Sequence, residues 1–109
     1  MNNCDCYPVA PELNFKVEDQ HIILGQPRDG DRCALALAIN ENPNCVEAVV
    51  CDDYISFNHS EYGSVSVESL DNTVTRFIAY HDQTSNKKRV KPGTLTINER
   101  TGEAHFEED

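Results

Sequence analysis

The longest uninterrupted apolar run in the chain extends from Cys33 to Ile39. Its alanines and leucines are strong helix formers, and the run is far shorter than the roughly 20 residues that a membrane span needs. Asp29 or Asp31 can cap the first turn, and Pro43 ends the helix because proline disfavours helical geometry at the preceding residue. A helix that is apolar all round is buried. The pattern therefore predicts that this run forms the central helix of the core.

Alternating apolar and polar positions predict short β-strands along the rest of the chain. The expected strands cover residues 14–17, 45–51, 54–57, 64–67, 94–98 and 103–106. The second and third are joined by the tight turn Asp52-Asp53 and should form a hairpin. Because both faces of residues 45–51 are largely apolar, we expect this strand to lie in the middle of its sheet.

Two further helices are predicted from caps and periodicity. Glu18-Asp19 favours a brief helix that ends at Gly25 in left-handed geometry, with His21 on its exposed face. Ser69 is expected to cap an amphipathic helix that runs to about Asp82. Its apolar residues recur at helical spacing and form one stripe, namely Leu70, Val74, Phe77 and Ile78.

A chain of 109 residues has room for one domain. We predict a single small α+β domain at residues 13–106, with an antiparallel or mixed sheet and two main helices packed on one face. Residues 1–12 are expected to form an extended N-terminal arm, and residues 107–109 a frayed acidic tail.

The formal net charge of −10 argues against direct binding to nucleic acid or to an anionic membrane, which both rely on Lys and Arg. It permits a protein partner with a basic surface. The N-terminus lacks a basic region and an apolar run, so we expect a cytoplasmic protein with free thiols at its five cysteines. Cys4-x-Cys6 has no second cysteine pair, and neither a metal nor another cofactor is predicted.

Three polar stretches supply the candidate binding residues. They are the acidic turn, the polar loop at residues 58–63 and the basic run at residues 87–91. The candidates are Asp52, Asp53, His59, Glu61, Tyr62, Lys87, Lys88 and Arg89. Solvated surface loops are the commoner explanation for residues of this kind. The sole nucleophile or acid–base pairings we can identify are Cys33 with His21 and His59 with Glu61, so no enzymatic activity is expected.

The segment Arg32 to Ile39 is preceded by Ile23-Leu-Gly25 and followed by Val74-x-x-Phe77-Ile78 and Val90-Lys-Pro92. Over residues 14–98 this arrangement resembles a loose group of small uncharacterised bacteriophage and prophage proteins. Members have a Cys-Pro-x-Ala-x-Ala helix start, from which this chain departs at Ala34. The resemblance implies a phage-encoded accessory protein without a known activity.

These observations lead to one expected function and one alternative. We expect a small acidic protein that binds and modulates or inhibits a host protein, as anti-CRISPR and anti-restriction proteins do, with carboxylates placed where nucleic acid would bind. The alternative is a small-ligand binder, such as a sponge for a nucleotide messenger. Because a short chain has little room for a deep pocket, that site would be shared between the subunits of a homodimer.

Overall fold

The computed structural model describes residues 11–26, 30–82 and 90–109, and it confirms an α+β domain. Most of the predicted arm, including Cys4 and Cys6, lies outside the described residues. In chain order the elements are β1 (Leu13–Val17), α1 (Asp19–Leu24), α2 (Ala34–Glu41), β2 (Cys45–Val50), β3 (Ile55–His59), β4 (Gly63–Val67), β5 (Ser69–Leu70), α3 (Asn72–Asp82), β6 (Gly93–Asn98) and β7 (Glu103–Glu108). No helix among these is long and apolar enough to cross a membrane.

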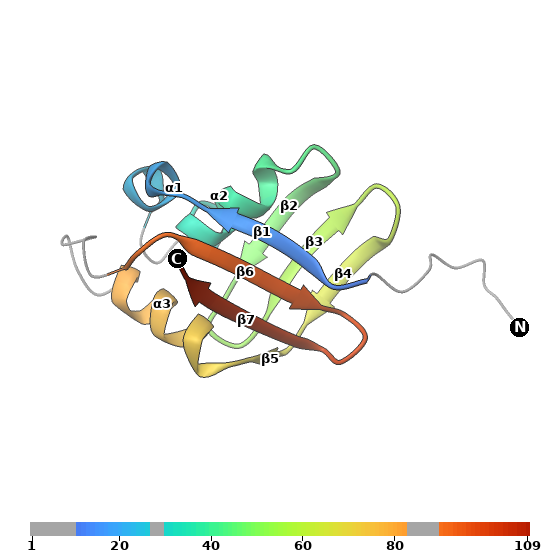
Figure 1. The fold of residues 1–109 in the computed structure, drawn as a ribbon. Helices are drawn as coiled ribbons and strands as arrows, with labels where there is room; N and C mark the ends of the chain where they lie inside the picture. Colours follow the sequence, from blue (N-terminus) through green and yellow to red (C-terminus); the bar gives the residue numbers. More distant parts are fainter. Residues whose placement is uncertain (1–10, 27–29, 83–89) are drawn as a thin grey trace, which may run out of the picture.

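The strands form two sheets, where the sequence predicted one. One sheet has the order β1-β6-β7-β5 and the other the order β2-β3-β4, and only the short β5–β7 pairing is parallel. Figure 1 shows the four-stranded sheet in front of the three-stranded one. Phe15 of β1 and Phe57 of β3 meet edge to face between the sheets, with ring centroids 5.5 Å apart. Helix α2 packs against β2 and β1, whereas α3 packs against β7 and β5.

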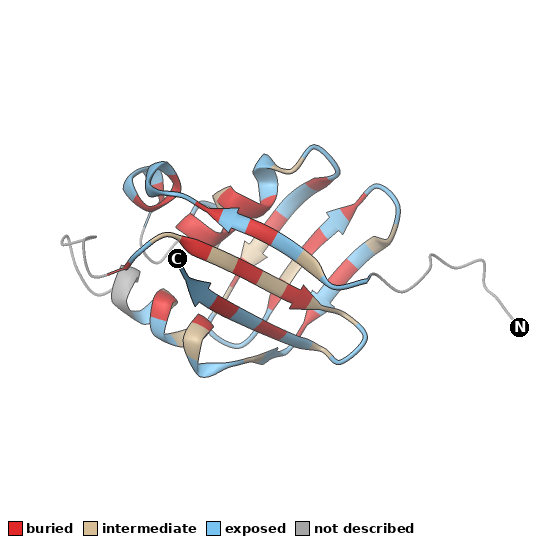
Figure 2. Ribbon diagram, in the orientation of Figure 1, coloured by how far each residue is buried: buried red, intermediate tan, exposed pale blue. Residues whose placement is uncertain are grey.

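The central position of α2 is confirmed. Leu35 and Ile39 are among the largest fully buried side chains, and the alanines of the helix are buried with them (Figure 2). The helix begins later than expected, because Cys33 occupies the N-cap position instead of Asp29 or Asp31, and Asp29 lies outside the described residues. All of the apolar run except partly exposed Leu37 is buried, and α2 packs against β1, β2 and α1.

The prediction that residues 45–51 form a central strand is wrong. β2 is an edge strand, and a β-bulge between Val46 and Val49 breaks its alternation. Glu47 adopts a positive φ of 58° there, so that Val46 is exposed while Ala48 turns inward. Because the bulge shifts the alternation within β2, apolar residues occur on both faces of the segment in the sequence pattern, although one face of the strand is exposed to solvent.

The boundaries near the C-terminal half also differ from prediction. Ser69 belongs to β5 instead of capping a helix, and α3 begins at Asn72. The last residues are not frayed. β7 continues to Glu108, which pairs with Gly93, and the amide of Asp109 donates to the carbonyl of Pro92. The terminal carboxylates are thus exposed side chains on an ordered strand.

Helix α1 ends without left-handed geometry, since Gly25 has φ −64°. Glycine is needed there for close packing, because a Cβ would lie 2.6 Å from the amide nitrogen of Ala34. The close approach brings α1 against α2 and buries His21, which was expected to be exposed.

Candidate protein-binding surface

The outer face of the three-stranded sheet is built mostly from small, uncharged side chains, together with the Glu47 carboxylate, which accepts a hydrogen bond from the side-chain amide of Asn58 at 3.0 Å. Strand pairing places Val46, Asn58 and Ser64 in one row across the sheet. The neighbouring row is Val49, Ser56 and Ser66. In β3 and β4 the intervening residues point inward to the core, as the period of two requires, whereas in β2 the bulge leaves Glu47 exposed next to Val46. The result is a flat, open face on one side of the molecule.

The charges around this face are all negative. The sequence contains no Lys or Arg between Arg32 and Arg76. We use the term acidic sheet for β2, β3, β4 and their connecting residues, numbers 45–68. Its five carboxylates are all exposed, and they are Glu47, Asp52, Asp53, Glu61 and Glu68. None of the five forms an ion pair with a Lys or Arg among the described residues.

The structure places five of the eight predicted binding residues on the acidic sheet. Asp52 and Asp53 lie in the turn between β2 and β3, and His59, Glu61 and Tyr62 lie at the turn between β3 and β4. The two groups therefore sit at opposite ends of β3 and do not converge on one pocket. Lys87, Lys88 and Arg89 lie outside the described residues.

His59 is a structural residue of its turn instead of an open-loop side chain. It is the last residue of β3 and only 8% exposed. Its Nδ1 accepts a hydrogen bond from the backbone amide of Glu61 at 3.0 Å, and its ring packs on Tyr62 with centroids 4.5 Å apart. Because His59 contacts the Glu61 amide and no contact with its carboxylate is formed, the pair is not arranged for acid–base chemistry.

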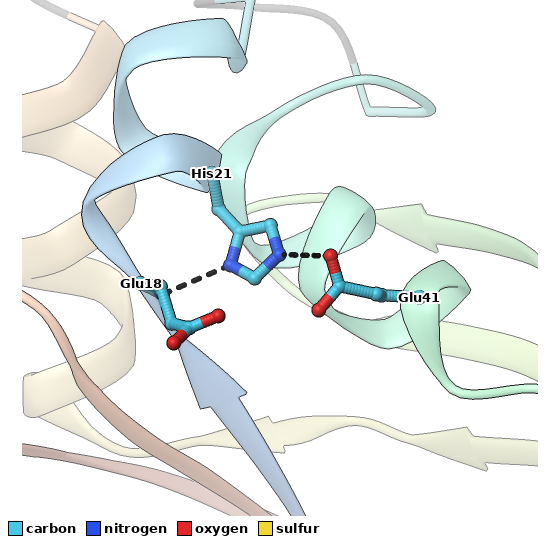
Figure 3. Close-up of side chains that lie close together, drawn as sticks. All are labelled: Glu18, His21 and Glu41. Carbon is cyan, nitrogen blue, oxygen red and sulfur yellow. Dashed lines mark hydrogen bonds and ion pairs between the residues drawn. The ribbon is translucent and has the colours of Figure 1, made fainter.

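A second histidine cluster joins α1 to α2 (Figure 3). The Nδ1 atom of buried His21 accepts from the amide of Glu18 at 2.9 Å, and its Nε2 lies 3.0 Å from a carboxylate oxygen of Glu41. Ligating atoms of these three residues all lie within 4.8 Å of one another. Both ring nitrogens are already engaged, so His21 is not placed to activate Cys33 as a nucleophile. Glu18 and His21 form a capping box at the start of α1, although Glu-x-x-His departs from the usual sequence signature of that motif.

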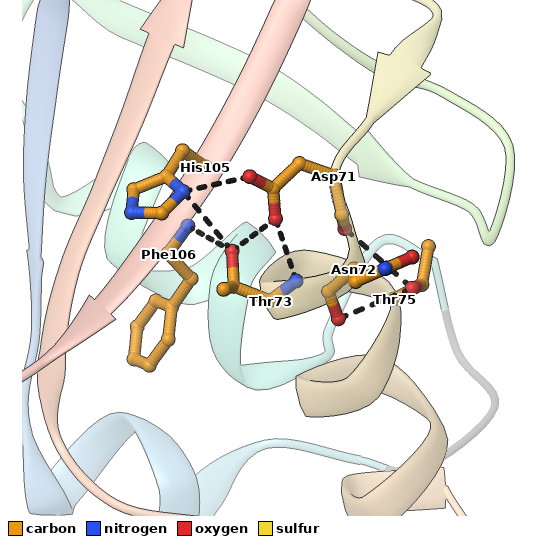
Figure 4. Close-up of polar contacts among 6 residues, drawn as sticks. All are labelled: Asp71, Asn72, Thr73, Thr75, His105 and Phe106. Atoms are coloured by element: carbon orange, nitrogen blue, oxygen red, sulfur yellow. Dashed lines mark hydrogen bonds and ion pairs between the residues drawn. The ribbon is translucent and has the colours of Figure 1, made fainter.

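A polar network at the start of α3 was not predicted (Figure 4). Asp71 accepts from the backbone amide of Thr73 at 2.6 Å, and its other oxygen lies 2.8 Å from Nδ1 of His105. Hydrogen bonds from the Thr73 hydroxyl, from His105 and from the Thr73 amide lower the pKa of Asp71 to about 2. The Thr73 hydroxyl also accepts from the amide of Phe106 at 2.9 Å, which fastens α3 to β7.

Beside this network lies a hollow of about 380 Å³ between α3 and β7. Its floor is formed by Phe77 and Phe106, whose ring centroids are 4.7 Å apart. Its remaining lining residues are Thr73, Arg76, Val90, His105, Glu107 and Glu108. Among the described residues it offers both cationic and anionic groups to a small molecule.

Comparisons of the chain with protein-family models, with curated proteins and with solved structures found no match.

Proposed function

We propose that this chain is a small acidic binding protein, phage-encoded, whose acidic sheet docks on a basic surface of a host protein and inhibits or modulates it. The observation that carries the proposal is the composition of that sheet. Residues 45–68 hold five exposed carboxylates and no Lys or Arg. A surface of one sign attracts an oppositely charged partner and speeds their encounter.

The carboxylates surround an area that is suited to contact. The outer face between them carries Ser56, Asn58, Ser64 and Ser66, and exposed Val46 lies at its β2 edge. Short side chains lose little conformational entropy on binding and let another surface come close. The natural ligands of basic protein grooves are phosphate backbones. Occupation of such a groove, as in the inhibition of a nuclease or a restriction enzyme, is therefore the mode of action we propose.

A pair of charge-reversal variants tests this function. Asp52→Lys/Asp53→Lys places the change on the acidic sheet, and Glu107→Lys/Glu108→Lys makes the same change in net charge on β7. Each tagged protein is incubated with the heparin-binding fraction of a bacterial lysate at 50 mM salt, and captured proteins are identified by mass spectrometry. We expect capture by the native chain and by the β7 variant, and at least tenfold less by the sheet variant.

Duplex DNA and salt supply the second half of this test. If nucleic acid normally occupies the partner's surface, added duplex DNA should displace the partner from the chain. A salt concentration of 500 mM should release the partner as well. Equal capture by both variants, or capture that neither salt nor DNA reduces, would refute the proposal.

The hollow between α3 and β7 favours a second candidate function, namely the binding of a small anionic ligand. Its volume lies in the range of ligand pockets, and Arg76 and His105 could meet an anionic group above the Phe77–Phe106 floor. Mass spectrometry of the native purified protein should then reveal a co-purified nucleotide-like molecule that is lost in Arg76→Ala. Its absence from protein prepared from infected cells would argue for the first function alone.

A further inference from the structure

The outer edge of β4 differs from the other sheet edges among the described residues. At β2, the bulge distorts the strand, the amide of Ala48 donates to the side chain of Asn40 at 3.0 Å, and the amide of Val50 donates to the carbonyl of Gly30 at 2.9 Å. β5 has two residues, and β1 carries exposed Lys16. Bulges, covered amides, short strands and lysines are the devices by which proteins prevent unwanted strand pairing.

None of these devices is present at β4. The strand has five residues, without charge or proline, and pairs with β3 in unbroken register. No hydrogen bond joins its other side to any residue that the structure describes. Figure 1 shows β4 at the margin of its sheet. Ser64 and Ser66 are exposed, whereas Val65 and Val67 are buried, so the edge offers unused backbone groups beside an ordered apolar face.

The charges at the two ends of β4 indicate which partner fits. Glu61 precedes the strand and Glu68 follows it, and both are exposed. In a second copy paired antiparallel about Val65, Glu68 would lie beside Tyr62 of the other copy and next to its Glu61. Two such approaches of like charge disfavour self-pairing. Lysine or arginine at both ends of an incoming strand would instead face a carboxylate at each end.

We propose that the edge of β4 is a docking strand for an extended segment of the partner protein, one with alternating apolar residues and basic residues at both ends. The incoming segment adds a fourth strand to the β2-β3-β4 sheet. Its backbone bonds to β4, its apolar side chains continue the inner face beside Val65 and Val67, and its ends meet Glu61 and Glu68. This inference rests on the proposed function and specifies the chemistry of the partner.

A synthetic peptide, Lys-Lys-Val-Ser-Val-Ser-Val-Lys-Lys, tests the inference by calorimetry and by amide hydrogen exchange of residues 63–67. The same peptide is made with N-methyl groups on two valine amides or on the two serine amides. Alternate amides of a strand point to opposite sides, so one isomer should bind like the parent and the other at least tenfold more weakly. A peptide with glutamate in place of the lysines should also bind at least tenfold more weakly.

Two matched variants of the protein distinguish binding at the edge of β4 from binding on the outer face of the sheet. Ser64→Lys and Val46→Lys add the same charge at opposite ends of one row across the sheet. Ser64→Lys should weaken binding of the basic peptide at least threefold more than Val46→Lys does. The outward amides of β4 should exchange freely in the native monomer and become protected with the peptide bound.

Four results would overturn the inference. They are equal binding of the two N-methyl isomers, equal effects of the two lysine variants, protection of every β4 amide in the free monomer, and a dimer in light scattering that Ser64→Lys dissociates. In each case the Asp52→Lys/Asp53→Lys comparison still reports separately on the proposed function. If that variant loses its protein partner while the β4 edge is not involved, the acidic sheet binds by its face or turns instead.

Discussion

Replacement of Asp71 tests how α3 is held against β7. The Asp71 carboxylate makes three contacts, because it accepts hydrogen bonds from the amide and the hydroxyl of Thr73 in the first turn of α3 and contacts His105 of β7. Asp71→Ala removes all three interactions. Asp71→Ser keeps a side-chain oxygen for the helix amide but loses the negative charge and the reach to His105.

The size of the effect follows from these contacts. Loss of an N-cap costs about 1 kcal/mol, whereas the contact with His105 is half exposed and contributes a few tenths of a kcal/mol at most. We therefore expect Asp71→Ala to lower the free energy of unfolding by about 1–1.5 kcal/mol and Asp71→Ser by less than about 0.5 kcal/mol. For a chain of this size the alanine variant should melt about 4–6 °C below the native protein.

The pH dependence gives a second measurement with a definite sign. The folded-state pKa of Asp71 is lowered to about 2 from 3.8. A lowered carboxyl pKa means that the stabilisation is complete above the unfolded value and is lost as pH falls through the folded value. The stability difference between the native protein and Asp71→Ser should therefore shrink as the pH falls from about 4 to 2.

Urea unfolding followed by circular dichroism measures both effects, with the two variants and the native chain in the same buffers. Equal stability of Asp71→Ala and Asp71→Ser would mean that the side-chain acceptor does not cap α3. A difference between native protein and Asp71→Ser that stays constant down to pH 2 would mean that the carboxylate is not held ionised by its neighbours.

Other substitutions test the packing, each by urea unfolding. Gly93→Ala should lower the free energy of unfolding by about 2–3 kcal/mol, because the added Cβ would lie 2.2 Å from the carbonyl oxygen of Glu107. Gly102→Ala should lower it by only about 1 kcal/mol, because Gly102 has a φ of 77° but open space around it. Similar losses for the two variants would contradict the predicted clash at Gly93. Leu35→Ala should cost about 3 kcal/mol, since the side chain is 1% exposed, and a loss below 1 kcal/mol would place Leu35 outside the tight core. Glu47→Gly should change the free energy of unfolding by less than about 1 kcal/mol, against the usual loss for glycine in a strand, because relief of the positive φ offsets the loss of the exposed hydrogen bond from Asn58; a loss above about 2 kcal/mol would contradict this.

The parts of the fold that could be predicted are those whose signal is local. The apolar run of α2 needs no partner to be recognised as buried, and the alternation in Ser64 to Val67 reads directly as β4. The bulge in β2 could not be seen, because the residue at its positive φ is Glu47 instead of the glycine that normally marks such a position. Without the bulge, Val46 and Ala48 share a face, and the strand reads as central.

The division into two sheets was hidden for a different reason. The chain passes from β4 to β5 through the single residue Glu68. The alternation of apolar and polar residues in each strand is compatible with one sheet and with two. Which sheet a strand joins depends on contacts such as Phe15 with Phe57, which lie 42 positions apart in the sequence. The burial of His21 likewise depends on Glu41, from the next helix. Contacts between residues that are far apart in the sequence do not produce a periodic pattern from which they could be predicted.

The candidate surface was visible in the sequence only in pieces. Asp52, Asp53 and Glu61 could be identified as exposed acids. The absence of Lys and Arg from residues 33–75 indicates a surface of one charge only once three strands from that segment are known to form one sheet. The network at Asp71 was missed because its two halves, Thr73 and His105, are on elements that meet only in the folded chain.

A sheet that carries charge of one sign could be expected to destabilise itself, and its geometry explains why the cost is small. The carboxylates of the two turns are separated by β3, whose five residues span about 17 Å. That distance is about twice the Debye length at physiological salt, roughly 8 Å, so repulsion between the two ends is largely screened. A lysine or arginine within about 4 Å of either end is screened much less. The same spacing that keeps the repulsion between the two ends small in the free chain therefore leaves each end able to attract a basic group at contact.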